Sequence, residues 1–210
     1  MYAISALQDP QRFYAQWRCH HLGSVVLAEA RSSSVRYLRS VLHVARGAYD
    51  HYQITFNFSG EVHYRSGRHS VIARAGDIVI VDNARETDAY VHAPDGGSAH
   101  QLALFVPRAA LAPLRRVPGA AHLLLLSHER PLARSVHEHL SQLLEAIGLE
   151  SPAAVRARTQ EMIALLAGGV GAAGPLAPTM RRTAHRSAAE SLERFIEWRL
   201  DSPALSVALL

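Results

Sequence analysis

The sequence predicts an α+β fold in which a β-sandwich or barrel is followed by an antiparallel helical hairpin. Two observations lead to this prediction. Residues 22–106 contain eight short segments rich in β-branched and aromatic residues, separated by turns containing Gly, Pro, Ser or Asp. After Pro107 the apolar residues change to the spacing of amphipathic helices.

The eight segments are short enough, and spaced closely enough, to be consecutive antiparallel strands. They are Leu22–Ala30, Val35–Val44, Tyr52–Phe58, Glu61–Ser66, Ser70–Ala73, Asp77–Asp82, Thr87–Val91 and His100–Val106. Alternation of apolar and polar residues is clearest in the third segment. Its apolar face consists of Tyr52, Ile54, Phe56 and Phe58. We expect this face to point into the barrel.

Helical spacing begins beyond the last predicted strand. A short helix is expected at Arg108–Arg116, ended by Pro118-Gly119. The next helix has the apolar stripe Leu132, Val136, Leu140, Leu143, Leu144 and Ile147, with Gly148 as its C-cap. A further helix begins at Ser151-Pro152 and carries Val155, Thr159, Met162, Ile163 and Leu166. The five-residue join predicts that the two long helices run antiparallel.

The last forty residues predict a linker and the start of another unit. Gly168–Pro178 is rich in Gly and Pro and has no periodicity, which is typical of a linker. A helix is expected from Ser187 or Ala188, and Asp201-Ser202-Pro203 ends it. The apolar segment that follows reaches the end of the chain at Leu210, so we expect a truncated domain there.

Composition excludes several classes of protein. The 210 residues are 49% hydrophobic, and the longest aliphatic run, Leu123–Leu126, is far short of the ~20 residues of a membrane span. No signal peptide is evident, so a soluble, cytoplasmic protein without a membrane partner is expected. All 22 basic residues are arginine, yet the net charge is only +4, and no basic stripe predicts nucleic-acid binding. Cys19 is alone, which excludes an intrachain disulfide.

Catalytic and metal motifs are missing from the sequence. His137 and His139 have the HxH spacing, but on a helix these side chains point apart. The sequence has no HExxH, GxSxG or phosphate-loop motif. We therefore predict no catalytic residue, no metal site and no cofactor, and expect that the protein is not an enzyme.

The most informative segment is Gly60–Val91, in which a hairpin with a Ser-Gly turn leads through an Ala-Gly-Asp turn into an apolar strand and a polar bend. Gly76 would supply a positive φ angle, and Asp77 could tie the turn to its own backbone. This segment resembles the core of the cupin barrel, a double-stranded β-helix. Metal-binding cupins have an HxH pair in the preceding strand and a histidine in the bend. Here Gln53 stands two residues after His51, and residues 83–87 contain no histidine. The resemblance therefore implies a cupin without the metal.

The whole layout is similar to the AraC family of transcription regulators, through the cupin turn, the last strand with its exit (His100–Ala109) and the segment Ser187–Leu210. The resemblance implies a division into five parts. They are an N-terminal arm (1–20), a cupin-like sensor barrel (21–107), a helical dimerisation segment (108–170), a linker (171–186) and the truncated start of a helix-turn-helix domain (187–210).

The resemblance also implies candidate site residues. In sugar-binding members the ligand is held from the strand after the bend and from the last strand, positions that correspond to Tyr90, His100 and Leu102. Leucine replaces a tryptophan that stacks on the sugar, which favours a more apolar effector. Tyr52 and Phe56 join them from the alternation argument. Dimer contacts are expected from Val155, Thr159, Met162, Ile163 and Leu166.

The expected function is the effector-sensing and dimerisation portion of a homodimeric AraC-type regulator, which contacts DNA only through a helix-turn-helix domain largely missing from this chain. Transcription activation is the expected mode, with repression left open, as is the identity of the effector. The alternative is a small metal-dependent cupin enzyme, an isomerase or dioxygenase. A naturally short regulator that sequesters full-length partners is a third possibility.

Overall fold

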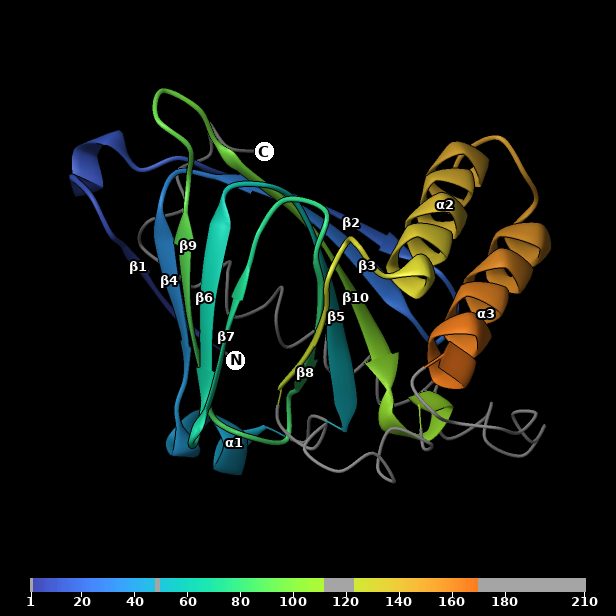
Figure 1. The fold of residues 1–210 in the computed structure, drawn as a ribbon, viewed down its shortest axis with the longest axis horizontal. Coiled ribbons are helices and arrows are strands. Elements are labelled where there is room, and N and C mark those ends of the chain that lie inside the picture. Colours follow the sequence, from blue (N-terminus) through green and yellow to red (C-terminus); the bar gives the residue numbers. More distant parts are fainter. Residues whose placement is uncertain (1, 48–49, 112–122, 170–210) are drawn as a thin grey trace.

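The computed structural model describes residues 2–47, 50–111 and 123–169 (Figure 1). It contains two antiparallel sheets and two long helices, α2 and α3. The two sheets face one another, and the helices α2 and α3 lie against the outer face of one of them. Among the described residues, no helix is long and apolar enough to cross a membrane.

Each sheet is built from strands far apart in the sequence. Sheet A has the order β1 (Ala3–Ala6), β4 (Val35–Arg39), β9 (Thr87–His92), β6 (Glu61–Ser66) and β7 (His69–Ala73). Sheet B has the order β11 (Leu123–Leu126), β8 (Ile78–Asp82), β5 (His51–Ser59), β10 (Ala99–Pro107), β3 (Val26–Ser32) and β2 (Ala15–His21). The helices are η1 (Pro10–Arg12), α1 (Val41–Arg46), α2 (Pro131–Ala146) and α3 (Pro152–Gly169).

All eight predicted strand segments contain a strand, which confirms the mixed α+β prediction. The strand predicted at Val35–Val44 is wrong in its second half, because β4 ends at Arg39 and α1 begins after Ser40. The backbone N–H of Ser40 donates to Nδ1 of His43 at 3.1 Å, a side-chain cap that favours a helical turn. Three strands were not predicted, namely β1, β2 and β11. They are edge strands in which apolar and polar residues alternate little. Pairing with the neighbouring strand, rather than local sequence, stabilises them.

Of the predicted sandwich or barrel, the structure has the two facing sheets of a sandwich, and they do not close into a barrel. Within the described residues each sheet has two unpaired edges, β1 and β7 in sheet A and β2 and β11 in sheet B. Closure would require a hydrogen-bonded ladder that continues around the whole circumference. The edge strands β1 and β11 have four residues each, and each pairs on one side only, so the sheets are joined by side-chain packing instead.

The central strands β8, β5 and β10 of sheet B are buried on both faces, which decides where their side chains point. One core cluster joins sheet B to α2 and α3, and it includes Tyr52, Ile54 and Phe56. A second cluster fills the space between the sheets. The expectation that the apolar face of β5 points toward the other sheet is therefore wrong. Because the helices cover that face, it carries the larger apolar side chains.

The predicted Ala-Gly-Asp turn joins β7 of sheet A to β8 of sheet B and is hydrogen-bonded to His128 and to α2. Gly76 has a φ of +87°, as expected, and the backbone N–H of Arg74 donates to Oδ2 of Asp77 at 2.9 Å. His128 also donates its backbone N–H to Asp77, and His137 of α2 lies with Nε2 2.8 Å from the Gly76 carbonyl oxygen. Burial would raise the pKa of Asp77, but the hydrogen bonds from Arg74 and His128 lower it.

Some expectations lie outside the described residues. These are most of the short helix Arg108–Arg116, the linker, and the helix expected from Ser187. Residues 108–111 do form a single tight helical turn. Gly148 has a φ of +88°, as its predicted place after the helix requires.

Candidate functional site

A cavity lies between the two sheets, lined by residues of both. Its volume is about 60 Å³, and all the empty space along it, open solvent included, amounts to about 690 Å³. Its aromatic lining is Tyr2, Trp17, Tyr37, Tyr64 and Phe105. Its aliphatic lining is Ile4, Ala30, Val81, Ala89, Val91 and Ala103. Four polar but uncharged residues complete it, namely Gln53, Thr55, Thr87 and Gln101.

Alternation in the strands explains this lining. Residues 53, 55, 101, 103 and 105 project from sheet B toward sheet A, and residues 37, 87, 89 and 91 project from sheet A toward sheet B. The N-terminal strands add to it, since Tyr2 precedes β1 and Trp17 lies on β2. The ring centroids of Trp17 and Tyr37 are 6.0 Å apart, with the ring planes at 89°. A mostly apolar cavity with a few polar groups is the usual form of a small-molecule site.

Part of the polar lining is satisfied within the protein. The hydroxyl of Tyr2 lies 3.0 Å from Oε1 of Gln53 and 2.6 Å from Oδ1 of Asn83. The amide of Gln53 donates to the hydroxyl of Thr55 at 3.1 Å. Burial raises the pKa of Tyr64 to about 12, although its hydrogen bond to Thr55 lowers it. These four lining residues therefore form one connected chain, and Tyr64 stays neutral at physiological pH.

The other two polar residues of the lining remain unpaired. Thr87 is 4% exposed and Gln101 is 9% exposed. Within the described part of the chain, Oγ1 of Thr87 and Nε2 of Gln101 have no hydrogen-bond partner and are shielded from solvent. A buried polar atom without a partner costs about 1–3 kcal/mol, so such atoms are rare. Two in one cavity indicate groups available to a ligand.

The five predicted ligand-contacting residues do not line this cavity. Tyr52, Phe56 and Leu102 project from the opposite face of sheet B and are buried in the core cluster that includes α2 and α3. They alternate along β5 and β10 with residues that line the cavity, and adjacent residues of a strand project to opposite faces.

Tyr90 and His100 also lie outside the cavity, each in a polar setting of its own. Tyr90 is on the outer face of sheet A, where the guanidinium carbons of Arg36 and Arg65 are 5.1 and 5.8 Å from its ring centroid. His100 has Nε2 2.9 Å from Oε1 of Glu29, and its ring stacks on Phe58. Burial, followed by the charge of Arg31, lowers the pKa of His100.

The residues expected at a dimer interface are buried within the chain itself. Val155, Thr159, Met162, Ile163 and Leu166 are at most 8% exposed. Four of them belong to the cluster between α2, α3 and sheet B, and Thr159 donates its hydroxyl to the Val155 carbonyl. Any contact with a second copy through α3 must therefore use the other face of this helix.

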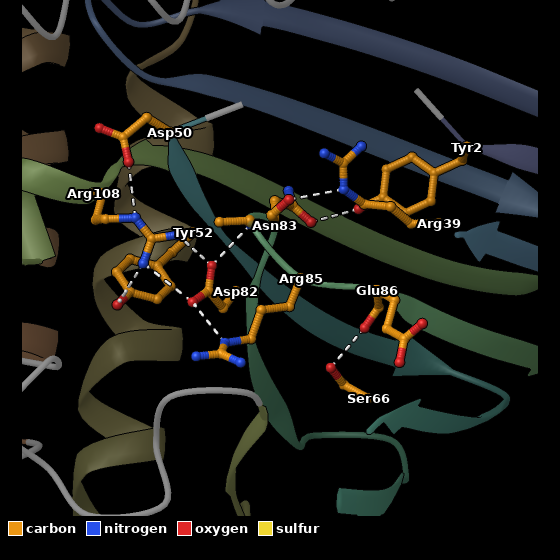
Figure 2. A network of polar contacts seen from close by, with 11 residues as sticks. Tyr2, Arg39, Asp50, Tyr52, Ser66, Asp82, Asn83, Arg85, Glu86 and Arg108 are labelled. Atoms are coloured by element: carbon orange, nitrogen blue, oxygen red, sulfur yellow. Dashed lines mark hydrogen bonds and ion pairs between the residues drawn. The ribbon is translucent and has the colours of Figure 1, made fainter. Parts of the chain in front are cut away.

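A charged network flanks the cavity at the bend after β8 (Figure 2). Arg108 donates from Nη1 and Nη2 to the two carboxylate oxygens of Asp82, from Nη1 to the hydroxyl of Tyr52 at 3.2 Å, and from Nε to Asp50 at 2.8 Å. Burial lowers the pKa of Arg108, but the hydrogen bond and the charge of Asp82 raise it well above its ordinary value. The pair fixes the start of β5 and the end of β10 to the bend.

The next residue of the bend holds a second arginine. Nε of Arg39, which is 1% exposed, donates to the backbone carbonyl of Asn83 at 2.8 Å. Its guanidinium carbon lies 5.8 Å from the ring centroid of Tyr2, and Figure 2 shows the two side chains beside one another. Asn83 therefore links the N-terminal segment to the sheets through Tyr2.

His51 is the buried histidine beside this network. It is 7% exposed, and its ring packs edge-on against Phe105 with centroids 5.6 Å apart. Burial, followed by the charges of Arg39 and the N-terminus, lowers the pKa of His51 from 6.5 to about 3. The unfolded chain therefore takes up a proton first, and the stability that neutral His51 provides is lost as the pH falls from 6.5 toward 3.

We expect acidification from pH 7.5 to 5 to destabilise the wild-type protein by about 2 kcal/mol more than the His51→Gln variant, because glutamine does not titrate. Urea unfolding at the two pH values measures this difference. The exposed His69, changed to Gln, serves as the control and should retain the wild-type pH dependence. Equal pH dependence in the wild type and His51→Gln would contradict the assignment.

No group of three or more His, Cys, Asp or Glu side chains that could hold a metal ion occurs in residues 2–47, 50–111 and 123–169.

The polar residues Thr87 and Gln101 of the cavity were not identified from the sequence. One sequence feature could have indicated the cavity face of β5, namely the polar residues Gln53 and Thr55 that alternate with apolar ones. It could be interpreted correctly only with knowledge that helices cover the apolar face.

Comparison with known proteins places this geometry among related folds. A family model described as AraC-binding-like domain matches residues 5–170. The crystal structure of the AraC-like transcriptional activator CuxR is similar at a TM-score of 0.72 and 18% identity, over 98% of this chain and 72% of that chain. ToxT from Vibrio cholerae O395 has a TM-score of 0.44 and 13% identity, over 71% of this chain and 56% of that chain. A search of curated proteins found no match.

A cupin is also among the solved structures that resemble the chain. The Cupin 2 conserved barrel domain protein from Salinispora arenicola CNS-205 has a TM-score of 0.33 and 14% identity, over 44% of this chain and 74% of that chain. The likeness to CuxR extends over the sheets and the helices and concerns the fold.

Proposed function

The chain belongs to the AraC-binding-like domain family, and on that basis we propose that it is the effector-sensing part of an AraC-type transcription regulator. The observation that carries the proposal is the cavity between the sheets, with its largely apolar lining and its two unpaired polar side chains. A small organic effector in this cavity would act without catalysis. Its binding would shift the equilibrium between two conformations of the chain toward the one that it binds more tightly. The size of this shift equals the difference between the binding free energies for the two conformations.

The N-terminal segment is a means by which a bound effector would change the rest of the molecule. Tyr2 and Ile4 form part of the cavity wall, and Tyr2 bonds to Gln53 and to Asn83 of the bend. Occupation of the cavity would alter these contacts. A helix-turn-helix domain would then read the change at DNA in the cytoplasm, with activation as the expected mode.

The test is a thermal-shift screen of small metabolites, charged and uncharged, against the 210-residue protein. A ligand at 100 times its Kd stabilises the folded state by about 2.7 kcal/mol, which raises the melting temperature by several degrees. Ala103→Leu and Ala89→Leu, on opposite walls of the cavity, should abolish the shift by filling the space. Ala45→Leu, at an exposed position of α1, is the matched control and should preserve it. The proposal fails if no stabilising compound depends on either cavity alanine.

Dimerisation is the second part of the proposal, and it uses the exposed face of α3. Small or polar residues recur there at helical spacing and would let a second helix approach closely. They are Ala153, Ala157, Gln160 and Ala164. We expect sedimentation equilibrium to give a homodimer, and Ala157→Glu to shift it toward monomer by at least tenfold in Kd. Glu145→Ala, on an exposed position of α2, should leave the dimer unchanged. A monomeric wild type at high micromolar concentration would refute this part.

A further inference from the structure

The charge of the cavity lining limits what it can bind. None of its fifteen residues is charged, and burial raises the pKa of Tyr64, so its phenol stays neutral. The buried guanidinium of Arg39 is not among the lining residues, and it donates to the Asn83 carbonyl. Transfer of an anion or a cation into such a space carries a large desolvation cost without a compensating partner. An uncharged ligand is therefore favoured.

Size and shape limit it further. The cavity volume of about 60 Å³ is less than half of the roughly 150 Å³ cavity that accommodates benzene in another protein. A ligand of one ring must therefore also occupy part of the empty space that is continuous with solvent. Because the cavity is a layer between two packed sheets with aromatic walls, a flat molecule of about one ring fits best.

The unpaired polar atoms define the functional group. The chain Tyr2, Gln53, Thr55 and Tyr64 is already connected by hydrogen bonds. What remains is the Thr87 hydroxyl from sheet A and the Gln101 amide nitrogen from sheet B, both of which can donate. A ligand oxygen is the group that complements two donors.

We propose that the cavity binds an uncharged, flat, mainly apolar compound of about one ring, whose carbonyl or hydroxyl oxygen accepts hydrogen bonds from Gln101 and Thr87. This inference rests on the proposed effector-sensing function and specifies the chemical class of the effector. It also supplies a hydrogen-bond partner for both shielded polar atoms.

Three probes of similar shape test the class. Acetophenone is flat and neutral and has a carbonyl acceptor, ethylbenzene lacks the acceptor, and benzoate is its anionic counterpart. Ligand-observed NMR titration should give acetophenone an affinity about five- to a hundredfold above that of ethylbenzene, the usual contribution of two hydrogen bonds. Benzoate should bind at least tenfold more weakly than acetophenone. A free pentose, which is neutral but strongly polar, should not bind.

Two variants test the residues. Gln101→Leu and Thr87→Val should each lower the affinity for acetophenone toward that for ethylbenzene, and leave the affinity for ethylbenzene unchanged within twofold. Because each removes an unpaired buried polar atom, neither should lower the melting temperature of the ligand-free protein. A merely structural role would instead lower the melting temperature and leave the affinities in the same ratio.

The outcomes separate this inference from the proposed function. Stronger binding of benzoate or of the pentose, lost in Ala103→Leu, would overturn the inference while the effector-sensing function stands. Acetophenone binding that neither Gln101→Leu nor Thr87→Val weakens would also overturn it. Absence of binding by all the probes overturns the proposed chemical class, and the wider metabolite screen then decides the proposed function.

Discussion

Replacing Arg108 with alanine is expected to lower the free energy of unfolding by about 2–4 kcal/mol, because it leaves the carboxylate of Asp82 without its main partner. The side chain of Asp82 is only 7% exposed, and its remaining contacts are the Ala84 backbone N–H at 2.9 Å and Arg85 at 3.8 Å. The Arg108 side chain is itself 17% exposed, so the expected loss is below the upper end for a fully buried pair. Urea unfolding at pH 7.5 measures the difference.

An exposed arginine–carboxylate pair provides the control for Arg108. Nη2 of Arg158 lies 2.7 Å from Oε1 of Glu150, and because both side chains are well exposed, solvent screens the pair and it contributes little to stability. Arg158→Ala should therefore have a small effect. The double variant Arg108→Met, Asp82→Leu should recover much of the stability lost in Arg108→Ala, since it removes both charges. Equal losses for Arg108→Ala and Arg158→Ala would show that the buried pair has no special weight.

The order of the strands along the chain could be predicted from sequence because β-branched and aromatic segments alternate with Gly and Asp turns. The Gly76-Asp77 turn was predicted in detail, since a positive φ and a side chain that accepts from its own turn are local properties. Closure of the barrel could not be predicted in the same way. It depends on whether edge strands such as β1 and β11 pair on both sides, which local sequence does not determine.

The candidate site was harder to predict, because alternation separates the two faces of a strand without saying which partner each one meets. In β5 the polar residues Gln53 and Thr55 line the cavity, whereas Tyr52 faces the core beside the helices. The apolar face of β5 points away from the other sheet because α2, which is far away in the sequence, packs against it. In β10, likewise, Gln101 lines the cavity, whereas Leu102 faces the core beside the helices.

Replacing Phe56 with alanine is expected to lower the free energy of unfolding by about 3–5 kcal/mol. Phe56 is 0% exposed, it belongs to the core cluster of sheet B with α2 and α3, and its ring packs edge-on against His137 with centroids 5.5 Å apart. Because this ring lies on the face remote from the cavity, the affinity of the folded variant for acetophenone should stay within twofold of wild type. Urea unfolding and NMR titration measure the two quantities.

Phe58 is the matched control, two residues further along the same face of β5. It is 38% exposed, so Phe58→Ala should cost only about 1 kcal/mol and should also leave acetophenone binding unchanged. If Phe56 pointed into the space between the sheets, its truncation would enlarge the cavity and change the affinities for acetophenone and ethylbenzene together. A large loss of stability with unchanged affinities is therefore specific to a side chain that anchors α2 to sheet B, and a change in both affinities would place Phe56 at the ligand instead.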